Sequence, residues 1–379
     1  MSTAAVIVFW LSVAALVYTP FGYLVCLAVI SHAARRPIKR APIRPSVSII
    51  VPVHNGAGII GRKIENLRAL DYPRELVEIV VVDDCSTDDT AALIPETRCI
   101  RLNRRQGKPA ALNAGLSAAS GELVGFTDVG VMMEPDALSA AVERFADPKI
   151  GCVSSEDIVV SAGGVGEGEV LYTRIDTHIR RLESLISSSV GVSGSFYLSR
   201  RELCPPFPLD QATDMFSGLY CVDRGFRAVV EMGSKVRIYA QADPRKEFDR
   251  KVRTMVTGLR ALRAFRHLLN PLRYGLFAWF LISHKMIRYL APAFAGGAFF
   301  SAVYLGSSNA FFHWCFIAEM AALGIGLLQI PRQTSAVARM LPSAPAFFCT
   351  SLAAAAFGWC RFAAGERYET WQPTERTAV

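Results

Sequence analysis

No Lys, Arg, Asp or Glu precedes Arg35 in this chain, and residues 4–30 are largely apolar. A helix needs about 20 apolar residues to cross a bilayer. Three further basic residues, Arg36, Lys39 and Arg40, follow Arg35 at once. A secretory signal peptide carries its positive charges ahead of a shorter apolar stretch. The opposite order seen here predicts a retained membrane helix, with residue 35 onward in the cytoplasm.

The far end of the chain contains further charge-free segments. Residues 289–318 and 340–360 carry no formal charge. Arg332 and Arg339 lie between the later segments and predict a cytoplasmic loop. Residues 274–284 are too short to span a bilayer and rich in Phe, Trp and Leu, which favours an interfacial helix. We expect membrane helices near 287–306, 310–330 and 343–362.

The composition is an average over apolar segments near the two ends and a more polar central region. Hydrophobic residues make up 51% and charged residues 20%, which excludes a disordered chain. Nine cysteines without a CxxC pair favour reduced thiols over disulfides or a zinc site. The net charge of +8 is concentrated at 35–40 and 245–288, beside the apolar segments. We therefore expect a membrane surface as a partner and no nucleic acid.

The region between residues 42 and 270 has frequent charges and alternating strand and helix patterns. Strands are predicted over 46–53, 77–82, 98–102 and 123–127, and helices over 59–70, 86–93, 109–119 and 135–145. Ser86 is expected to cap the second of these helices. The alternation predicts an α/β fold with an open, doubly wound parallel sheet. Ligands of such sheets bind beyond the carboxyl ends of the strands.

Polar residues follow three of the predicted strands, at His54-Asn55, Asp83-Asp84 and Asp128. Any one Asp at a strand end is typical of a turn or helix cap. The sheet would bring all three strand ends to one edge. Carboxylates gathered there require cations, hydroxyls or a metal nearby, so this edge is the candidate site.

Four segments in this region resemble glycosyltransferase family 2, whose fold is the Rossmann-like, doubly wound GT-A fold. They are PSVSIIVPVHNG (45–56), VVVDDCSTDDT (80–90), GKPAALNAGL (107–116) and FTDVGVMMEPDAL (126–138). Their order and spacing match the family across 42–254. RKVRT (250–254) and WQPTER (371–376) are similar to the membrane-bound bacterial branch.

The resemblance implies a donor site for a nucleotide-diphosphate sugar, with UDP as the expected nucleotide. Asp84 matches the aspartate that contacts the base, and Lys108 matches the lysine that approaches the nucleotide or its phosphates. Asp128 matches the first residue of the DxD motif. The donor-binding residues implied in this way are Pro52, Asn55, Asp84, Lys108, Asp128 and Arg253.

The resemblance also implies a divalent cation, Mg²⁺ or Mn²⁺, with Asp128 as its ligand. The DxD motif here reads Asp128-Val129-Gly130, so Gly130 replaces the second aspartate. One carboxylate then remains, and diphosphate oxygens and water would supply the other ligands.

The general base that the resemblance implies is Asp214. In similar membrane synthases a Gly follows the catalytic Asp by 11 positions, and Gly225 follows Asp214 by 225 − 214 = 11. A plain position at the start of a helix remains an alternative for Asp214, and Asp210 and Asp223 are rivals. The segment GVSGSFYLSRREL (191–203) resembles the acceptor-side strand, which implies Gly194 and Ser195 on the acceptor side.

The RKVRT segment departs from the Gln-Arg-x-Arg-Trp motif of processive synthases. Arg253 matches its second Arg and could bind diphosphate, whereas Thr254 replaces the Trp that stacks on a growing polymer. This argues against a processive enzyme. A lipid-facing basic patch is the alternative for the cluster.

We therefore expect an inverting glycosyltransferase that acts on a lipid-linked or membrane-associated acceptor in surface polysaccharide or glycolipid synthesis. Two alternatives stay open: a non-catalytic nucleotide-sugar-binding assembly subunit with a degenerate DxD, and a processive polysaccharide synthase. The expected location is the bacterial cytoplasmic membrane, with several spans and a cytoplasmic catalytic domain. The expected division is 1–34 (membrane helix), 42–255 (GT-A domain), 256–285 (interfacial helices), 286–363 (membrane helices) and 364–379 (tail).

Overall fold

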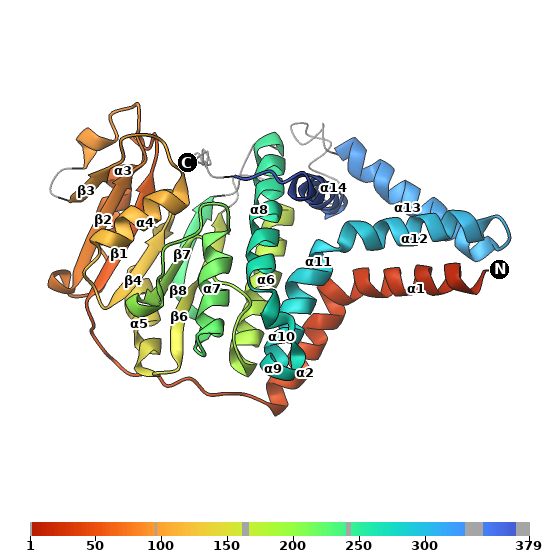
Figure 1. The fold of residues 1–379 in the computed structure, drawn as a ribbon, viewed down its shortest axis with the longest axis horizontal. Coiled ribbons are helices and arrows are strands. Elements are labelled where there is room, and N and C mark those ends of the chain that lie inside the picture. Colours follow the sequence, from red (N-terminus) through yellow and green to blue (C-terminus); the bar gives the residue numbers. More distant parts are fainter. Residues whose placement is uncertain (1, 95–96, 161–166, 240–243, 330–343, 369–379) are drawn as a thin grey trace.

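A mixed eight-stranded sheet carries the predicted strands (Figure 1). The computed structural model describes residues 2–94, 97–160, 167–239, 244–329 and 344–368. The strands in these ranges are β1 (Val47–Val53), β2 (Val77–Asp83), β3 (Arg98–Arg101), β4 (Leu123–Thr127), β5 (Met132–Met133), β6 (Ile150–Val160), β7 (Phe196–Arg200) and β8 (Arg227–Tyr239). They lie in the order β3-β2-β1-β4-β7-β6-β8-β5.

The first half of the sheet is parallel and the second half is mixed. β1 pairs in parallel with β2 and β4, and β2 with β3, as expected. β7 runs antiparallel to both β4 and β6. The expectation of a wholly parallel sheet is therefore wrong. An apolar run predicts a buried strand but not its direction, because direction depends on the path of the chain between strands.

The continuous apolar run of β1 is explained by burial on both faces of the sheet. All seven residues of β1 are buried. Ile50 belongs to one apolar cluster, whereas Ile49 and Val51 belong to another. Successive side chains of a strand point to opposite faces, so both faces of β1 need apolar residues. This leaves the ends of the strands as the place for polar chemistry.

The helices of this region largely follow the sequence pattern. Helices expected over 59–70 and 109–119 are confirmed as α3 (Ile60–Arg68) and α4 (Lys108–Ala118). The helix expected over 135–145 is shorter, as α5 (Ala137–Val142) followed by a 3-10 turn. Three longer helices complete the region: α6 (Glu167–Ile186), α7 (Thr213–Asp223) and α8 (Pro244–Ala264). α8 runs unbroken across residue 255, where we expected a domain boundary.

The helix expected over 86–93 is wrong. Only a 3-10 turn, Ala91–Leu93, forms in this stretch. The Ser86 hydroxyl accepts a hydrogen bond from the backbone N–H of Asn55 at 2.9 Å, so it does not cap a helix. The two strand-end loops are tied together instead, a long-range contact that the local pattern could not reveal.

The apolar ends of the chain form helices that project away from the sheet (Figure 1). α1 (Thr3–Val17), a π-turn (Tyr18–Gly22) and α2 (Tyr23–Ala33) make one helix over residues 3–33. Among the described residues, it alone is long and apolar enough to cross a bilayer unaided. A second span would result if Leu276–Tyr289 and Ala291–Gly306, which are bent by 59°, act together.

The remaining apolar helices agree in position with the expected segments. They are α12 (Ala291–Gly306), α13 (Ala310–Gln329) and α14 (Ala344–Ala363). Large apolar side chains on these helices and on α1 are exposed, for example Leu11 and Phe300 at 64% and 70%. α1 and α12 approach closely, since a Cβ on Gly297 would lie 2.6 Å from the Ser12 hydroxyl. The loop expected at Arg332 and Arg339, and residues 371–376, lie outside the described residues.

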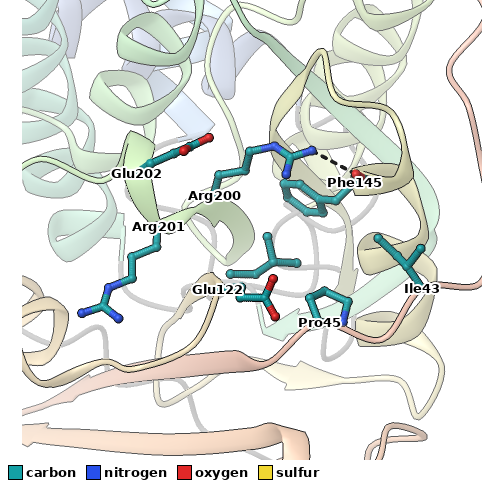
Figure 2. Close-up of a pocket in the computed structure, with 8 residues that line it drawn as sticks. Ile43, Pro45, Glu122, Phe145, Arg200, Arg201 and Glu202 are labelled. Atoms are coloured by element: carbon teal, nitrogen blue, oxygen red, sulfur yellow. Dashed lines mark hydrogen bonds between the residues drawn. The ribbon is translucent and has the colours of Figure 1, made fainter.

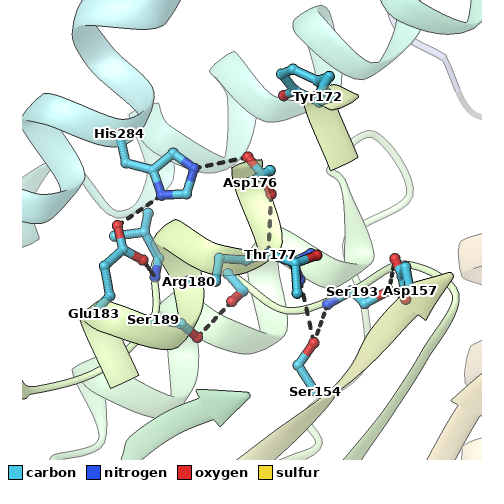
Figure 3. Close-up of polar contacts among 12 residues, drawn as sticks. Ser154, Asp157, Tyr172, Asp176, Thr177, Arg180, Glu183, Ser189, Ser193 and His284 are labelled. Atoms are coloured by element: carbon cyan, nitrogen blue, oxygen red, sulfur yellow. Dashed lines mark hydrogen bonds and ion pairs between the residues drawn. The ribbon is translucent and has the colours of Figure 1, made fainter. Parts of the chain in front are cut away.

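A buried polar network joins the apolar helices to the sheet domain (Figure 3). The Tyr23 hydroxyl donates to Glu183 Oε1 at 2.7 Å. The fully buried His284 ring lies between Glu183 Oε1 at 2.8 Å and Asp176 Oδ1 at 3.0 Å. Arg288 also pairs with Asp176, at 2.9 Å. Because these contacts connect α2, α6 and the segment around residue 284, they hold the domain in one orientation to the apolar helices.

Replacing Gly218 by Ala is expected to destabilise the fold by about 1–3 kcal/mol. An added Cβ would lie 2.5 Å from the backbone Cα of Gly191. Denaturant unfolding of the purified chain in detergent measures the effect. Gly61→Ala in α3 is the matched control, because a Cβ there meets no atom within 4 Å and a helical Gly→Ala change is expected to stabilise. Equal midpoints for the two variants would contradict this account of the α7 contact.

Candidate active site

One cavity lies at the edge of the sheet opposite to the one where the chemistry is predicted. Figure 2 shows this cavity of about 690 Å³. It is lined by Ile43, Pro45, Glu122, Leu123, Phe145, Arg200, Arg201 and Glu202. Leu123 begins β4 and Arg200 ends the antiparallel β7, so the cavity lies at the amino ends of the parallel strands. Arg200 and Arg201 already donate to backbone carbonyls. We therefore place no chemistry here.

Asp84, directly after β2, organises the loop that precedes α4. Its side chain is buried, and its two carboxylate oxygens accept the backbone N–H groups of Gln106 and Gly107, each at 2.7 Å. Gly107 has a φ of 88°, a conformation that suits glycine. Asp84 thereby fixes the position of Lys108, which follows Gly107 and is the first residue of α4. Contact between Asp84 and a nucleotide base stays a prediction.

Three of the predicted donor-binding residues lie together. Lys108 forms an ion pair with Asp128 Oδ1, and both side chains are partly exposed. Asp128 follows β4, and its backbone N–H donates to the carbonyl of Ser195 at 3.4 Å. Arg253 approaches from α8: burial and the neighbouring Arg250 lower the pKa of Arg253, whereas Asp128 opposes this shift. Lys108 and Asp128 thus lie in contact at the predicted edge, and Arg253 is close enough for its charge to interact with that of Asp128.

Two further donor predictions, Pro52 and Asn55, lie at the same edge in supporting positions. Pro52 is buried within β1. Asn55 has a left-handed φ of 52°, and its side-chain oxygen accepts the backbone N–H of Thr87 at 2.9 Å. These contacts hold the loops after β1 and β2 together. Direct contact of either residue with a donor stays a prediction.

Lys63 in α3 is a buried residue of this edge that the sequence analysis did not single out. Its ammonium donates to the Thr127 hydroxyl at 3.1 Å and to the Val131 carbonyl. These residues flank Asp128, so Lys63 positions the loop that carries it. Lys63 shares the buried face of α3 with Ile60, Ile64 and Leu67. A lysine at an apolar position of a helix was the signal available in the sequence.

The buried side chain of Lys63 should make the free energy of unfolding depend on pH. Burial lowers the pKa of Lys63 from 10.5 to about 7, against the opposing effect of Asp128. Between these pH values the unfolded chain binds a proton that the folded chain does not, so stability rises with pH by up to about 1.4 kcal/mol per unit. Lys63→Met should remove this slope. We expect the difference in unfolding free energy between wild type and variant to change between pH 7 and 10; a constant difference would contradict the assignment.

Asp214 has the environment expected of a base that is free to react. It lies in the first turn of α7, and within the described ranges its carboxylate makes no hydrogen bond or ion pair. Its two rivals are engaged: Asp210 pairs with Arg260 at 3.1 Å, and Asp223 lies 2.7 Å from the His267 ring. The geometry therefore favours Asp214 among the three carboxylates.

A second cavity, of about 150 Å³, opens in front of Asp214. It is lined by Asp157, Asp176, Arg180, Val190, Gly191, Val192, Ser193, Gly194, Asp214, Met215 and Lys285. Gly194 lies beside the Asp214 carboxylate, where a Cβ would come within 3.5 Å of it. Ser195 donates to Asp157 at 3.3 Å and shares a backbone contact with Asp128. The backbone hydrogen bond between Ser195 and Asp128 therefore links the loop that lines the cavity to the loop that carries Asp128.

The residues at this edge fit a divalent cation only in part. Asp128 Oδ1 is buried and accepts no well-aligned hydrogen bond, although Lys108 lies against it. Gly130 offers no second carboxylate. In the described part of the chain, no three His, Cys, Asp or Glu side chains are grouped to hold a metal. Asp128 could therefore hold a cation only together with oxygen ligands from a substrate and water.

Comparison with known proteins finds sequence similarity in the first part of the sheet domain. Residues 48–203 match the family model described as glycosyl transferase family 2. The chain is 41% identical over 105 residues to the succinoglycan biosynthesis protein ExoO of Rhizobium meliloti (strain 1021), covering 26% of the chain and 30% of that protein. It is 34% identical over 118 residues to a beta-monoglucosyldiacylglycerol synthase of Synechocystis sp., covering 29% of the chain and 25% of the synthase. The chain thus spans less than a third of the length of these two relatives.

One solved structure resembles almost the whole chain. It is the mannosyltransferase PcManGT from Pyrobaculum calidifontis, in complex with GDP-Man and Mn²⁺. The TM-score is 0.72 at 22% sequence identity, and the match covers 95% of this chain and 100% of that one. At this level of identity the likeness concerns the fold, and it confirms the GT-A fold that the sequence motifs imply.

Proposed function

We propose that the protein transfers a sugar from a nucleotide-diphosphate sugar to a membrane-associated acceptor, because residues 48–203 match the family model of glycosyl transferase family 2 and the chain has the GT-A fold. The observation that carries this proposal is that a site suited to a diphosphate lies near a cavity with a carboxylate that could act as a base. An edge with Lys108, Asp128 and Arg253 lies near a cavity that holds the carboxylate of Asp214, which has no partner among the described residues.

The donor would bind across the carboxyl ends of β1, β2 and β4. Lys108 and Arg253 would contact the diphosphate, whose charge increases as the bond to the sugar breaks. Lys108 would then exchange its ion pair with Asp128 for phosphate oxygens. The loop held by Asp84 would set the position of the nucleotide. UDP is the nucleotide that the resemblance favours, and the bound GDP-Man of PcManGT makes a guanine nucleotide the competitor to test.

The transfer would proceed in one inverting displacement. The Asp214 carboxylate removes the proton of an acceptor hydroxyl, and the resulting oxygen attacks the anomeric carbon. The bond from that carbon to the diphosphate oxygen breaks, and the nucleotide diphosphate leaves. The cavity beside Gly194 is where the attacking hydroxyl would lie, because it adjoins both Asp214 and the loop of Asp128.

A divalent cation, Mn²⁺ or Mg²⁺, would complete the donor site. PcManGT was solved with Mn²⁺. Asp128 would hold the cation together with diphosphate oxygens. Such a cation neutralises charge on the leaving group when it is bound. With Gly130 in place of a second carboxylate, cation and nucleotide should bind together and not separately.

The acceptor would be a membrane lipid or a lipid-linked sugar, and the protein would act at the cytoplasmic face of a bacterial membrane. Exposed apolar side chains on α1, α12 and α13 support insertion of these helices in a bilayer. The buried Tyr23–Glu183–His284 contacts would hold the cavity at the membrane surface. The names of the two relatives support an acceptor in polysaccharide or glycolipid synthesis.

The test is transfer of a radiolabelled sugar by the purified full chain in lipid vesicles. A panel of UDP- and GDP-sugars would be supplied with Mn²⁺ and total lipid extract. We expect one donor to yield labelled, chloroform-soluble product and free nucleotide diphosphate. Nucleotide binding without hydrolysis or transfer from any donor would favour the non-catalytic subunit. A water-insoluble polymer would favour the processive synthase, which Thr254 in place of Trp argues against.

A further inference from the structure

Lys285 is a cation in the second cavity for which the proposed transfer gives no role. It lies in the π-turn Ile282–Met286, between the sheet domain and the apolar helices. In the parts of the chain that the structure describes, its ammonium makes no hydrogen bond and no ion pair, and Lys285 lines the same cavity as Asp214. A charged group in a confined site is costly unless it meets a partner.

The other charged groups of the cavity are already satisfied by the protein. Asp157 accepts hydroxyl hydrogen bonds from Ser155, Ser193 and Ser195 at 3.1, 2.6 and 3.3 Å, and Figure 3 shows it beside Ser193. Burial nevertheless raises the pKa of Asp157, which favours the neutral, protonated form of its carboxyl group.

Asp176 and Arg180 likewise form ion pairs within the protein. Asp176 lies 3.0 Å from the His284 ring (Figure 3). It also pairs with Arg180 at 3.0 Å and with Arg288 at 2.9 Å. The Arg180 guanidinium also donates to Thr177 at 3.2 Å. Among the described residues that line the cavity, Asp214 and Lys285 are therefore the two opposite charges without an ion pair.

Building on the proposed function, we propose that Lys285 binds a phosphate group that the acceptor carries close to its reacting hydroxyl. A ligand that satisfies both free groups needs a hydroxyl for Asp214 and an anion for Lys285. A lysine binds phosphate as a point charge. The cavity of about 150 Å³ has room for roughly five waters, so it fits a phosphate and its neighbouring carbons but not a whole lipid. The position of Lys285 at the junction with the apolar helices favours a phosphate borne by a membrane lipid.

The test is a titration of the full chain in detergent, with UDP and Mn²⁺ present so that the donor edge is filled. The probes are inorganic phosphate, phosphatidic acid in mixed micelles, and diacylglycerol in the same micelles as the uncharged control. The variants are Lys285→Met, which removes the charge, and Lys285→Arg, which keeps it. Lys149→Met, at an exposed lysine near the amino end of β6, is the matched control.

We expect wild type, Lys285→Arg and Lys149→Met to bind phosphatidic acid more tightly than diacylglycerol, and Lys285→Met to lose about 10- to 100-fold in that binding. Phosphatidic acid binding well above that of inorganic phosphate supports a lipid source, and equal binding supports a soluble phosphate. Binding by Lys285→Met equal to wild type, or no binding of either phosphate by wild type, overturns the proposal. Failure of the proposed function is distinct, since it appears as absence of UDP or GDP binding and of sugar transfer.

Discussion

Asp214→Asn should lower the rate of sugar transfer by about 10³-fold and leave nucleotide binding unchanged. General-base catalysis contributes typically about 10²–10⁴-fold, and Asn keeps the shape of the side chain while losing its ability to take the proton. Asp214 is favoured for this role because its carboxylate has no protein partner among the described residues and lines the cavity beside Gly194. The measurement is kcat for transfer from the active donor, with nucleotide binding by calorimetry.

The rival carboxylates provide the controls for this experiment. Asp223→Asn removes a contact with His267 on an exposed part of the surface and should leave kcat within about twofold. Asp210→Asn breaks the ion pair with Arg260, so its effect should appear mainly in thermal stability. Full turnover by Asp214→Asn, or a kcat loss of about 10³-fold in either rival instead, would reassign the base.

Asp128→Asn should abolish the enhancement of nucleotide binding by Mn²⁺ and lower transfer by about 10²–10³-fold, the range for loss of one electrostatic stabiliser. Asp128 is the only carboxylate that the DxD segment retains, and its Oδ1 faces Lys108 without an aligned hydrogen bond. Calorimetry of UDP or GDP, with and without Mn²⁺, measures the effect. Wild type should bind Mn²⁺ only when a nucleotide diphosphate is present.

Gly130→Asp is the matched variant, because it restores the second carboxylate of the motif. We expect it to bind Mn²⁺ about tenfold more tightly in the presence of nucleotide diphosphate, since carboxylate oxygens are preferred ligands of such hard cations. Thermal unfolding checks that the Lys63-supported loop tolerates the change. Mn²⁺ enhancement in Asp128→Asn equal to that of wild type would show that the cation, if used, is held elsewhere.

Local sequence patterns were sufficient for much of the parallel half of the sheet. β1, β2, β4, α3 and α4 lie where the apolar runs and helical periodicity predicted them. These elements are specified by short stretches of residues that must be buried together. The expected helix over 86–93 failed because Ser86 and Asn55 contact each other across two loops. The prediction of a parallel sheet was wrong for β7 for a similar reason, because the direction of this strand depends on the path of the chain through α6.

Some residues of the candidate site were likewise found from the sequence, and others only from the structure. The motifs placed Asp84, Lys108 and Asp128 at strand and helix ends, and the structure gathers the last two with Arg253. The family resemblance implied Asp214 as the base, and tertiary contacts then distinguished it from Asp210 and Asp223, which are both paired. The position of Lys63 on the apolar face of its helix indicated burial, but no local pattern indicated that it contacts the loop of Asp128.

By itself the sequence determined which segments are apolar enough for a membrane, which runs form buried strands, and which polar residues follow them. These properties depend on the side chains within a short window. Only the tertiary structure decided that Asp214 and Lys285 share one cavity, and that Asp157 and Asp176 there are already paired. The reason is physical: whether a charge is free depends on every group that folding brings near it, and those groups come from distant parts of the chain.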